Sequence, residues 1–257
     1  MGHIISISNQ KGGVGKTTTA VNLSASLVAS EKKCLLIDCD PQGNATTGLG
    51  LDKASIRTGL YDFILGSEQE EAVILDTSMP GLRIMAATRE LIGAEVEMYI
   101  EDNREYLLKK RLAPLKNKYD FIFLDCPPSL GFLTLNAMTA ADSVLVPLQC
   151  EYYALEGLSQ LLDTYHAVKR GLNPDLQLAG ILLTMYDSRN NLSNQVEEEV
   201  RGHFKDLVFN TIIPRNVRVS EAPSHGKPII LYDITSKGSQ SYLKLAMELM
   251  NKGVNHD

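Results

Sequence analysis

The sequence lacks the features that mark exported or membrane-spanning proteins. It has no run of about 18 apolar residues, which a membrane-spanning helix would need. Its first residues enter an apolar strand pattern at once, without the basic segment and cleavage site of a secretory leader. We therefore expect a cytoplasmic protein with no membrane association.

Cysteine is scarce, and its spacing matches no common motif. The sequence has four cysteines, Cys34, Cys39, Cys126 and Cys150, and none belongs to a Cys-x-x-Cys pair. Three of them lie in or beside apolar runs, so we expect reduced thiols in the core. A metal or iron–sulfur site is the alternative, and these spacings do not favour it.

Positive charge is also in short supply over the whole chain. The net charge of −6 argues against a protein that binds nucleic acid over most of its surface. The charge is uneven, however, because residues 201–245 carry seven basic and three acidic side chains. This stretch is either an ordinary solvated face or a local basic surface on an acidic protein.

The 257 residues show alternating strand and helix patterns. Runs of strand length are almost continuously apolar, which is typical of strands covered on both faces in a parallel sheet. The expected strands are residues 4–8, 34–38, 82–86, 121–125, 143–148, 178–184 and 208–213. The expected helices are residues 16–30, 95–115, 132–141, 154–170, 192–204 and 240–250.

This alternation predicts an α/β fold, doubly wound, with a mostly parallel twisted sheet and helices on both faces. No repeat, low-complexity tract or flexible linker interrupts the chain, so we expect a single domain over residues 1–257. Residues 50–80 are the least patterned, and we expect short helices and loops there.

The strongest motif is a glycine-rich segment between the first strand and the first helix. Its residues are Lys11, Gly12, Gly13, Val14, Gly15, Lys16, Thr17 and Thr18, all predicted to bind a nucleotide. Glycines let backbone N–H groups turn toward phosphates, and the helix dipole favours the same anion. Lys16 is placed to reach the β- and γ-phosphates, and Thr17 to bind Mg²⁺. A simple glycine turn is the alternative.

The loop departs from the usual P-loop pattern at its start. Gln10 stands where the first glycine would fall, and Lys11 follows it. We do not expect a second lysine there to serve the same phosphate in the same way as Lys16. Its position allows it to reach a nucleotide held by another subunit, although a solvated lysine is the alternative.

Carboxylates end two of the apolar runs. Asp125 follows the run 121–124, at the strand end where ligands bind in open α/β sheets. Asp38 and Asp40 follow a second run, and we expect Asp38 to be structural and Asp40 to position the attacking water. The candidate magnesium ligands are Thr17, Asp40 and Asp125, and the candidate catalytic residues are Lys11, Lys16 and Asp40.

The segment 11–18 resembles the deviant Walker A motif of the ParA/MinD ATPases. Further segments resemble the chromosomal ParA proteins called Soj, and the likeness runs from about residue 4 to 250. The matching segments are residues 38–44, 125–129, 151–157, 183–187 and 213–218, with 221–223. The resemblance implies the P-loop NTPase fold, with ATP and Mg²⁺ as cofactors.

The same resemblance implies roles for individual residues. Lys11 contacts the nucleotide of the opposite subunit in an ATP-dependent homodimer, and Asp40 is needed for hydrolysis. Pro214 and Asn216 lie beside the adenine. Arg189 and Arg218 resemble the arginines with which the family grips nonspecific DNA. A ParB-type centromere-binding protein stimulates hydrolysis, and the protein is nucleoid-associated.

Four other kinds of protein share parts of these patterns. A MinD-like membrane-associated ATPase would end in a basic amphipathic helix, whereas we expect residues 241–250 to pack on the domain through Leu243, Ala246, Met247 and Met250. An iron–sulfur reductase would need a different cysteine pattern. A biosynthetic amide or carbon–nitrogen ligase lacks a supporting motif here. A plasmid ParA with an added helix-turn-helix would need room before the first strand.

Overall fold

A seven-stranded sheet forms the centre of the computed structural model, which describes residues 1–151 and 154–253. The strand order is β3-β4-β2-β5-β1-β6-β7, and every pairing is parallel except that of β3 with β4. The strands are β1 (His3–Ile7), β2 (Cys34–Asp38), β3 (Ile74–Asp76), β4 (Leu82–Met85), β5 (Phe121–Asp125), β6 (Ser143–Gln149) and β7 (Gln177–Thr184). The predicted mostly parallel α/β fold is confirmed.

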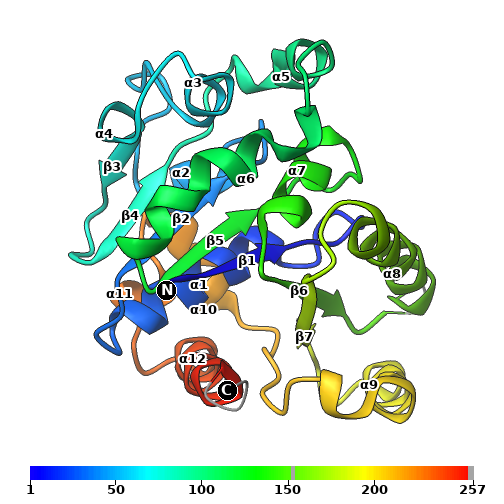
Figure 1. The fold of residues 1–257 in the computed structure, drawn as a ribbon. Coiled ribbons are helices and arrows are strands. Elements are labelled where there is room, and N and C mark those ends of the chain that lie inside the picture. The colour runs from blue at the N-terminus through cyan, green and yellow to red at the C-terminus, as the bar shows by residue number, and fades with distance from the viewer. Residues whose placement is uncertain (152–153, 254–257) are drawn as a thin grey trace.

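Helices cover both faces of the sheet (Figure 1). The α-helices are α1 (Lys16–Val28), α2 (Asn44–Gly48), α3 (Leu60–Leu65), α4 (Glu70–Val73), α5 (Leu91–Met98), α6 (Leu107–Leu112), α7 (Phe132–Ala140), α8 (Ala154–Gly171), α9 (Asn191–Phe204), α10 (Val217–Glu221), α11 (Ile229–Tyr232) and α12 (Lys237–Gly253). Short 3-10 helices are η1 (Arg104–Tyr106), η2 (Ala113–Asn117), η3 (Lys205–Leu207) and η4 (Ala222–His225).

Two apolar cores result, because successive strand residues point to opposite faces. In β1, Ile4 joins the core under α3 and α5 to α9, whereas Ile5 and Ile7 join the core under α1, α2 and α10 to α12. Both faces are thereby buried, which explains the almost continuous apolar runs.

Parallel strands bring their carboxyl ends to one edge of the sheet. Asp38 at the end of β2 is in register with Asp125 at the end of β5, and Ile7 of β1 is in register with Asp125 on the other side. The loops that follow β1, β2 and β5 therefore converge at this edge, where α/β folds bind ligands.

The expected strand at residues 208–213 is wrong. Only two isolated bridges form, Ile181 with Val208 and Tyr186 with Pro214. Between them, the backbone N–H groups of Asn210 and Thr211 donate to the Glu248 carboxylate of α12, at 2.7 and 2.9 Å. The Glu248 side chain thus takes the place that a neighbouring strand would have as hydrogen-bond acceptor for these two N–H groups.

The expected helix at residues 95–115 is also wrong in its extent. It is divided into α5, η1, α6 and η2, and Asn103 interrupts it in the left-handed conformation at φ 54°. The seventh strand is instead β3, which lies in the region where we expected only short helices and loops.

The C-terminal helix α12 packs on the domain, as predicted; of the predicted contact residues, Ala246 is buried and Met250 packs against the core, but Met247 does not take part. Tyr242, Leu245, Ala246 and Leu249 are buried in the core beside α1, whereas Met247 is 51% exposed. No helix in the described ranges is both long and apolar enough to cross a membrane.

Candidate nucleotide-binding site

The glycine-rich loop connects β1 to α1 at the carboxyl edge of the sheet. Gly13 and Gly15 have φ of 76° and 88°, a left-handed conformation that other residues adopt only with strain. Two side chains fix the loop to its neighbours: Thr184 at the end of β7 donates to the Val14 carbonyl at 2.8 Å, and Asn9 donates to the Pro147 carbonyl of β6 at 2.7 Å. The loop is thus held on two strands besides its own.

Lys16 lies inside this loop. Lys16 is only 6% exposed, and its Nζ donates to the Lys11 carbonyl at 3.0 Å. Burial lowers the pKa of Lys16, and the nearby carboxylates of Asp125 and Asp40 oppose that shift. The ammonium is therefore preorganised over the loop, where a phosphate would be received.

Lys11 points elsewhere. Its Nζ forms an ion pair with Glu151 at 2.7 Å, and the two side chains are 37% and 46% exposed. The backbone N–H of Lys11 is held by the Asn9 side chain at 2.9 Å. The two loop lysines thus occupy different environments, one buried in the loop and one at its solvent-facing rim.

Asp125 is a buried carboxylate that the protein itself does not satisfy. Neither of its oxygens has a hydrogen-bond partner among the described residues. Burial, followed by the charge of Asp38, raises the pKa of Asp125 well above its usual range, and the Thr17 hydroxyl counteracts this rise in part. An unsatisfied buried carboxylate beside a hydroxyl and a lysine fits a site for Mg²⁺ and phosphate, since carboxylate and hydroxyl oxygens are ligands that Mg²⁺ prefers.

Asp38 and Asp40 have separate environments. Asp38 is fully buried, and its Oδ2 accepts hydrogen bonds from the Thr46 backbone N–H at 2.8 Å and from its hydroxyl at 2.7 Å. Burial raises the pKa of Asp38 to about 6. Asp40 instead lines the cavity described next, and its Oδ1 accepts from the Gln42 N–H at 2.9 Å.

A cavity of about 450 Å³ opens above the loop. Its lining residues are Gly12, Gly13, Gly15, Lys16, Thr17, Thr18, Val21, Asn22, Asp40, Asn44, Thr47, Gly48, Pro128, Met185, Ala222, Pro223 and Lys227. Met185 and Lys227 were not among the nucleotide-binding residues predicted from the sequence. Met185 has φ of 51°, and such a strained position next to a ligand cavity cannot be read from residue type.

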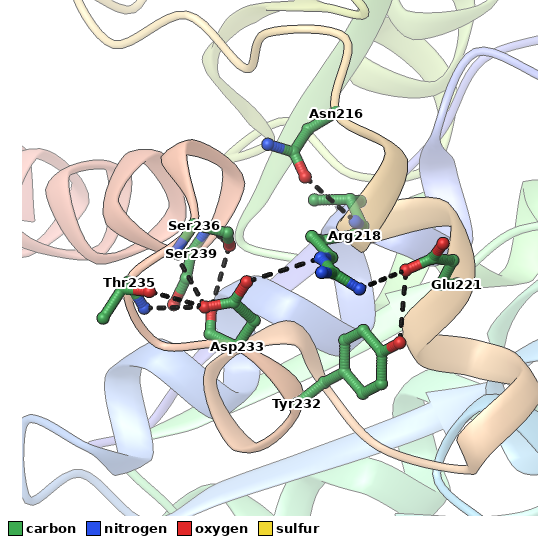
Figure 2. A network of polar contacts seen from close by, with 9 residues as sticks. Asn216, Arg218, Glu221, Tyr232, Asp233, Thr235, Ser236 and Ser239 are labelled. Atoms are coloured by element: carbon green, nitrogen blue, oxygen red, sulfur yellow. Dashed lines mark hydrogen bonds and ion pairs between the residues drawn. The ribbon is translucent and has the colours of Figure 1, made fainter.

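Pro214 and Asn216, the predicted adenine neighbours, do not line this cavity. Pro214 bridges Tyr186, which follows the cavity residue Met185. The Asn216 side chain caps α10 by accepting from the Val219 N–H at 3.2 Å (Figure 2). Their role beside the adenine remains a prediction.

The two predicted DNA-contacting arginines are exposed and ion-paired. Arg189 is held by Asp187 through two bonds of 2.9 and 2.8 Å, and its side chain is 88% exposed. Arg218 contacts Glu221 at 3.0 Å and Asp233 at 3.7 Å (Figure 2). Arg215 was not among the predicted DNA contacts; its backbone N–H donates to the carbonyl of Tyr186, the residue before Asp187, at 2.9 Å.

These features define a P-loop nucleotide hydrolase. A strand leads through a glycine-rich loop into a helix that begins at a buried lysine, and the neighbouring strands end in carboxylates. Comparison with known sequences narrows this class. The profile of a family described as an AAA domain matches residues 2–178. The chain is 60% identical over 252 residues to the chromosome partitioning protein ParA of Myxococcus xanthus, covering 98% of this chain and 89% of that protein.

It is also 56% identical to the sporulation initiation inhibitor protein Soj of Bacillus subtilis, over 98% of this chain and all of that protein. The chain belongs to the ParA/Soj family of chromosome-partitioning ATPases. The matching string at residues 151–157 includes Tyr152 and Tyr153, which lie outside the described residues.

Among solved structures, cobyrinic acid a,c-diamide synthase from Mycobacterium smegmatis with bound ADP and magnesium is similar, with a TM-score of 0.88. It is 37% identical, and the match covers all of this chain and 97% of that one. The identity to partitioning proteins is much higher, so the comparisons support the partitioning assignment and not the MinD-like alternative.

Proposed function

We propose that this ATPase is a nucleotide-controlled DNA clamp that positions chromosomal or plasmid DNA. Its ATP-bound form is a sandwich dimer that holds DNA without reading sequence, and hydrolysis disperses the dimer. The observation that carries this proposal is the division of labour between Lys16, buried in the loop of its own subunit, and Lys11, held at the exposed rim by Glu151.

The cofactors are ATP and Mg²⁺. The loop N–H groups, the N-terminus of α1 and Lys16 bind the phosphates, and Thr17 and Asp125 hold the metal beside them. Bound magnesium supplies charge neutralisation at the phosphates. Asp40 lines the same cavity and positions the attacking water, since phosphoryl transfer depends on positioning more than on strong basicity.

Dimer formation requires Lys11 to change partner. In the structure its ammonium is paired with Glu151, and this pair is partly exposed, so it contributes little stability. A phosphate of a nucleotide in a second subunit carries more negative charge than one carboxylate. Exchange of Glu151 for that phosphate thus links nucleotide binding to assembly.

DNA binding follows the same logic at the surface. Arg189 and Arg218 are paired with carboxylates that DNA phosphates replace, without contacts to base edges. Two copies in a dimer form one composite surface, which binds more tightly than either alone. A ParB-type centromere-binding partner accelerates hydrolysis and releases the DNA, so the ATP-bound protein is nucleoid-associated.

The decisive experiment is a size measurement on Asp40→Ala with and without ATP, followed by binding to nonspecific duplex DNA. We expect this variant to bind ATP, to hydrolyse it at least about 100-fold more slowly and to accumulate as a DNA-bound dimer. The matched control is Asp175→Ala, which removes an exposed carboxylate from the loop before β7 and leaves hydrolysis unchanged.

A variant that stays monomeric with ATP would contradict the role of Asp40. The diamide synthase likeness favours one second candidate, an ATP-dependent amide ligase. A ligase shows no ATP-dependent DNA binding, so the same experiment separates the two functions. Sedimentation with liposomes in the presence of ATP tests the MinD-like alternative.

A further inference from the structure

Helix α5 carries an apolar surface on its outer side. Four of the ten exposed large apolar side chains of the described residues lie in α5 and in the two residues that follow it, namely Ile92 (69% exposed), Val96 (75%), Tyr99 (65%) and Ile100 (83%). The remaining six are scattered through the chain. We call these four residues the α5 stripe. Scattered exposed apolar residues are normal, whereas a contiguous patch marks an interaction site.

The stripe is a second face of the helix, distinct from the face that packs on the protein. Leu91, Ala94 and Met98 are fully buried and join the core. At 3.6 residues per turn, the four stripe residues fall within about 100° of one another, on the opposite side. Figure 1 shows α5 at the periphery of the molecule, beside α3. The side chains of the stripe are mostly exposed, and among the described residues only Arg104 is seen over one of them, the ring of Tyr99.

The surroundings of the stripe are acidic. Glu90, Glu97, Glu101 and Asp102 are exposed around it, and the exposed cation Arg89 beside Glu90 offsets only one of these four charges. The nearest cation downstream, Arg104, is already engaged: its guanidinium lies 4.2 Å from the centre of the Tyr99 ring and pairs with Glu105 at 3.2 Å. This contact shows how a cation fits on the stripe, through the ring face of Tyr99.

The apolar centre of the stripe and its acidic rim together indicate which kind of partner binds there. A second copy of α5 would bring one acidic rim against another, which disfavours self-association. A helix with aliphatic residues on one face and lysines or arginines at its margins complements both features. We propose that the α5 stripe docks a basic amphipathic helix of a partner protein, and that docking there adjusts the rate of ATP hydrolysis. The second half of this proposal rests on the proposed function.

Two routes of contacts connect the stripe to the nucleotide cavity. Upstream of α5, the Ala87 N–H donates to the Thr46 hydroxyl at 3.2 Å, and that hydroxyl donates to Asp38 at 2.7 Å. Asp38 in turn accepts from the N–H of Asp40 at 3.3 Å. A shift of α5 therefore acts on the loop that carries Asp40.

The other connection starts at Arg104, downstream of α5. Its guanidinium also lies 5.7 Å from the ring centre of Phe132, the first residue of α7. Thr134 of the same helix donates to the Ser129 carbonyl at 2.7 Å, and the neighbouring Pro128 lines the cavity. The stripe is thus linked to both loops that flank the phosphate site.

The test uses a fluorescent peptide of about 14 leucines and lysines, long enough as a helix to span the stripe, with all leucines on one face. Anisotropy is measured on the full chain without nucleotide. We expect binding that weakens with salt, and a loss of about tenfold, equal to about 1.4 kcal/mol, for Ile92→Gln with Val96→Gln. The matched control is Ile234→Gln with Met247→Gln, which removes apolar side chains that are 55% and 51% exposed elsewhere.

Equal affinity of the peptide for the α5 variant and the control variant would overturn the docking surface, as would equal binding of a peptide with the same residues in scrambled order. A nucleotide-independent dimer that the α5 substitutions dissociate would assign the stripe to self-association instead. Hydrolysis by wild-type protein is then measured at saturating peptide, and an unchanged rate would overturn the regulatory half. A protein that binds the peptide but lacks ATPase activity would refute the proposed function and leave the docking surface standing.

Discussion

The phosphate loop and the surface that carries Arg189 and Arg218, here called the arginine surface, both depend on basic side chains, yet they differ in how those side chains are held. Lys16 is 6% exposed and bonded to a backbone carbonyl, whereas the Arg189 side chain is 88% exposed and paired with a carboxylate two residues away. A buried ammonium that is bonded to a backbone carbonyl is held in a single position. An exposed ion pair contributes little to stability and exchanges its partner easily. The phosphate loop therefore suits one ligand of defined geometry, whereas the arginine surface suits a polyanion of any sequence.

The largest effect should come from the buried side of this comparison. We expect Lys16→Ala to weaken ATP binding by more than about 100-fold, because at least two charge-assisted hydrogen bonds of about 1.5 kcal/mol each are lost. Isothermal titration calorimetry with ATP and Mg²⁺ measures this loss. Lys11→Ala is the control: the monomer should still bind ATP, while ATP-dependent dimerisation disappears. Loss of ATP binding in both variants would show that Lys11 serves its own subunit.

The exposed side should give a smaller and salt-dependent effect. Arg189→Ala and Arg218→Ala should each lower the DNA affinity of the ATP-bound dimer by about tenfold and flatten its salt dependence, with ATPase activity intact. Filter binding over a range of salt concentrations measures both quantities. Arg170→Ala, an exposed arginine at the end of α8, is the control. Equal loss of ATPase activity would instead place the arginines in the fold or the cavity.

A stability measurement sharpens the comparison, because the cavity is unfavourable without its ligand. The raised pKa of Asp125 means that folding favours its protonated form, so this contribution to stability is lost as the pH rises through the folded-state pKa. We expect nucleotide-free Asp125→Asn to melt a few degrees above wild type at pH 8, which corresponds to about 1 kcal/mol. The difference should shrink at pH 5.

Thermal melts at both pH values, with and without ATP and Mg²⁺, test this expectation. The ligands should stabilise the wild type more than Asp125→Asn, since the variant lacks the carboxylate that holds the metal. A wild type that is the more stable protein at both pH values without ligand would show that Asp125 is satisfied by the protein itself.

The smallest effect concerns the ion pairs that restrain the arginine surface. Glu221→Gln removes the negative partner of Arg218 but keeps an acceptor for the Tyr232 hydroxyl (Figure 2). DNA affinity should rise about two- to threefold, in line with the small energy of an exposed ion pair. Glu198→Gln on α9 removes an equal charge from another exposed position, and an equal rise there would indicate a general charge effect.

Local patterns predicted the elements that depend on neighbouring residues. The strands at 34–38 and 121–125 have the expected bounds, and α1 begins at Lys16 as its loop predicted. Prediction failed where a distant group intervened. Glu248 of α12 takes the backbone N–H groups of Asn210 and Thr211, so no regular strand forms there. Met247 faces solvent, because the packing face of α12 is centred on Tyr242, Leu245 and Leu249, beside the predicted Ala246.

The sequence by itself determined the phosphate loop, the strand-terminal carboxylates and the family, because each depends on residue types at fixed short spacings. Only the tertiary structure decided that the Asp125 carboxylate has no hydrogen-bond partner within the described part of the chain, that Lys11 pairs with Glu151, and that Met185 and Lys227 line the cavity. It also left the α5 stripe uncovered. Burial and pairing are set by segments far apart in the chain, and no local pattern records which of them meet.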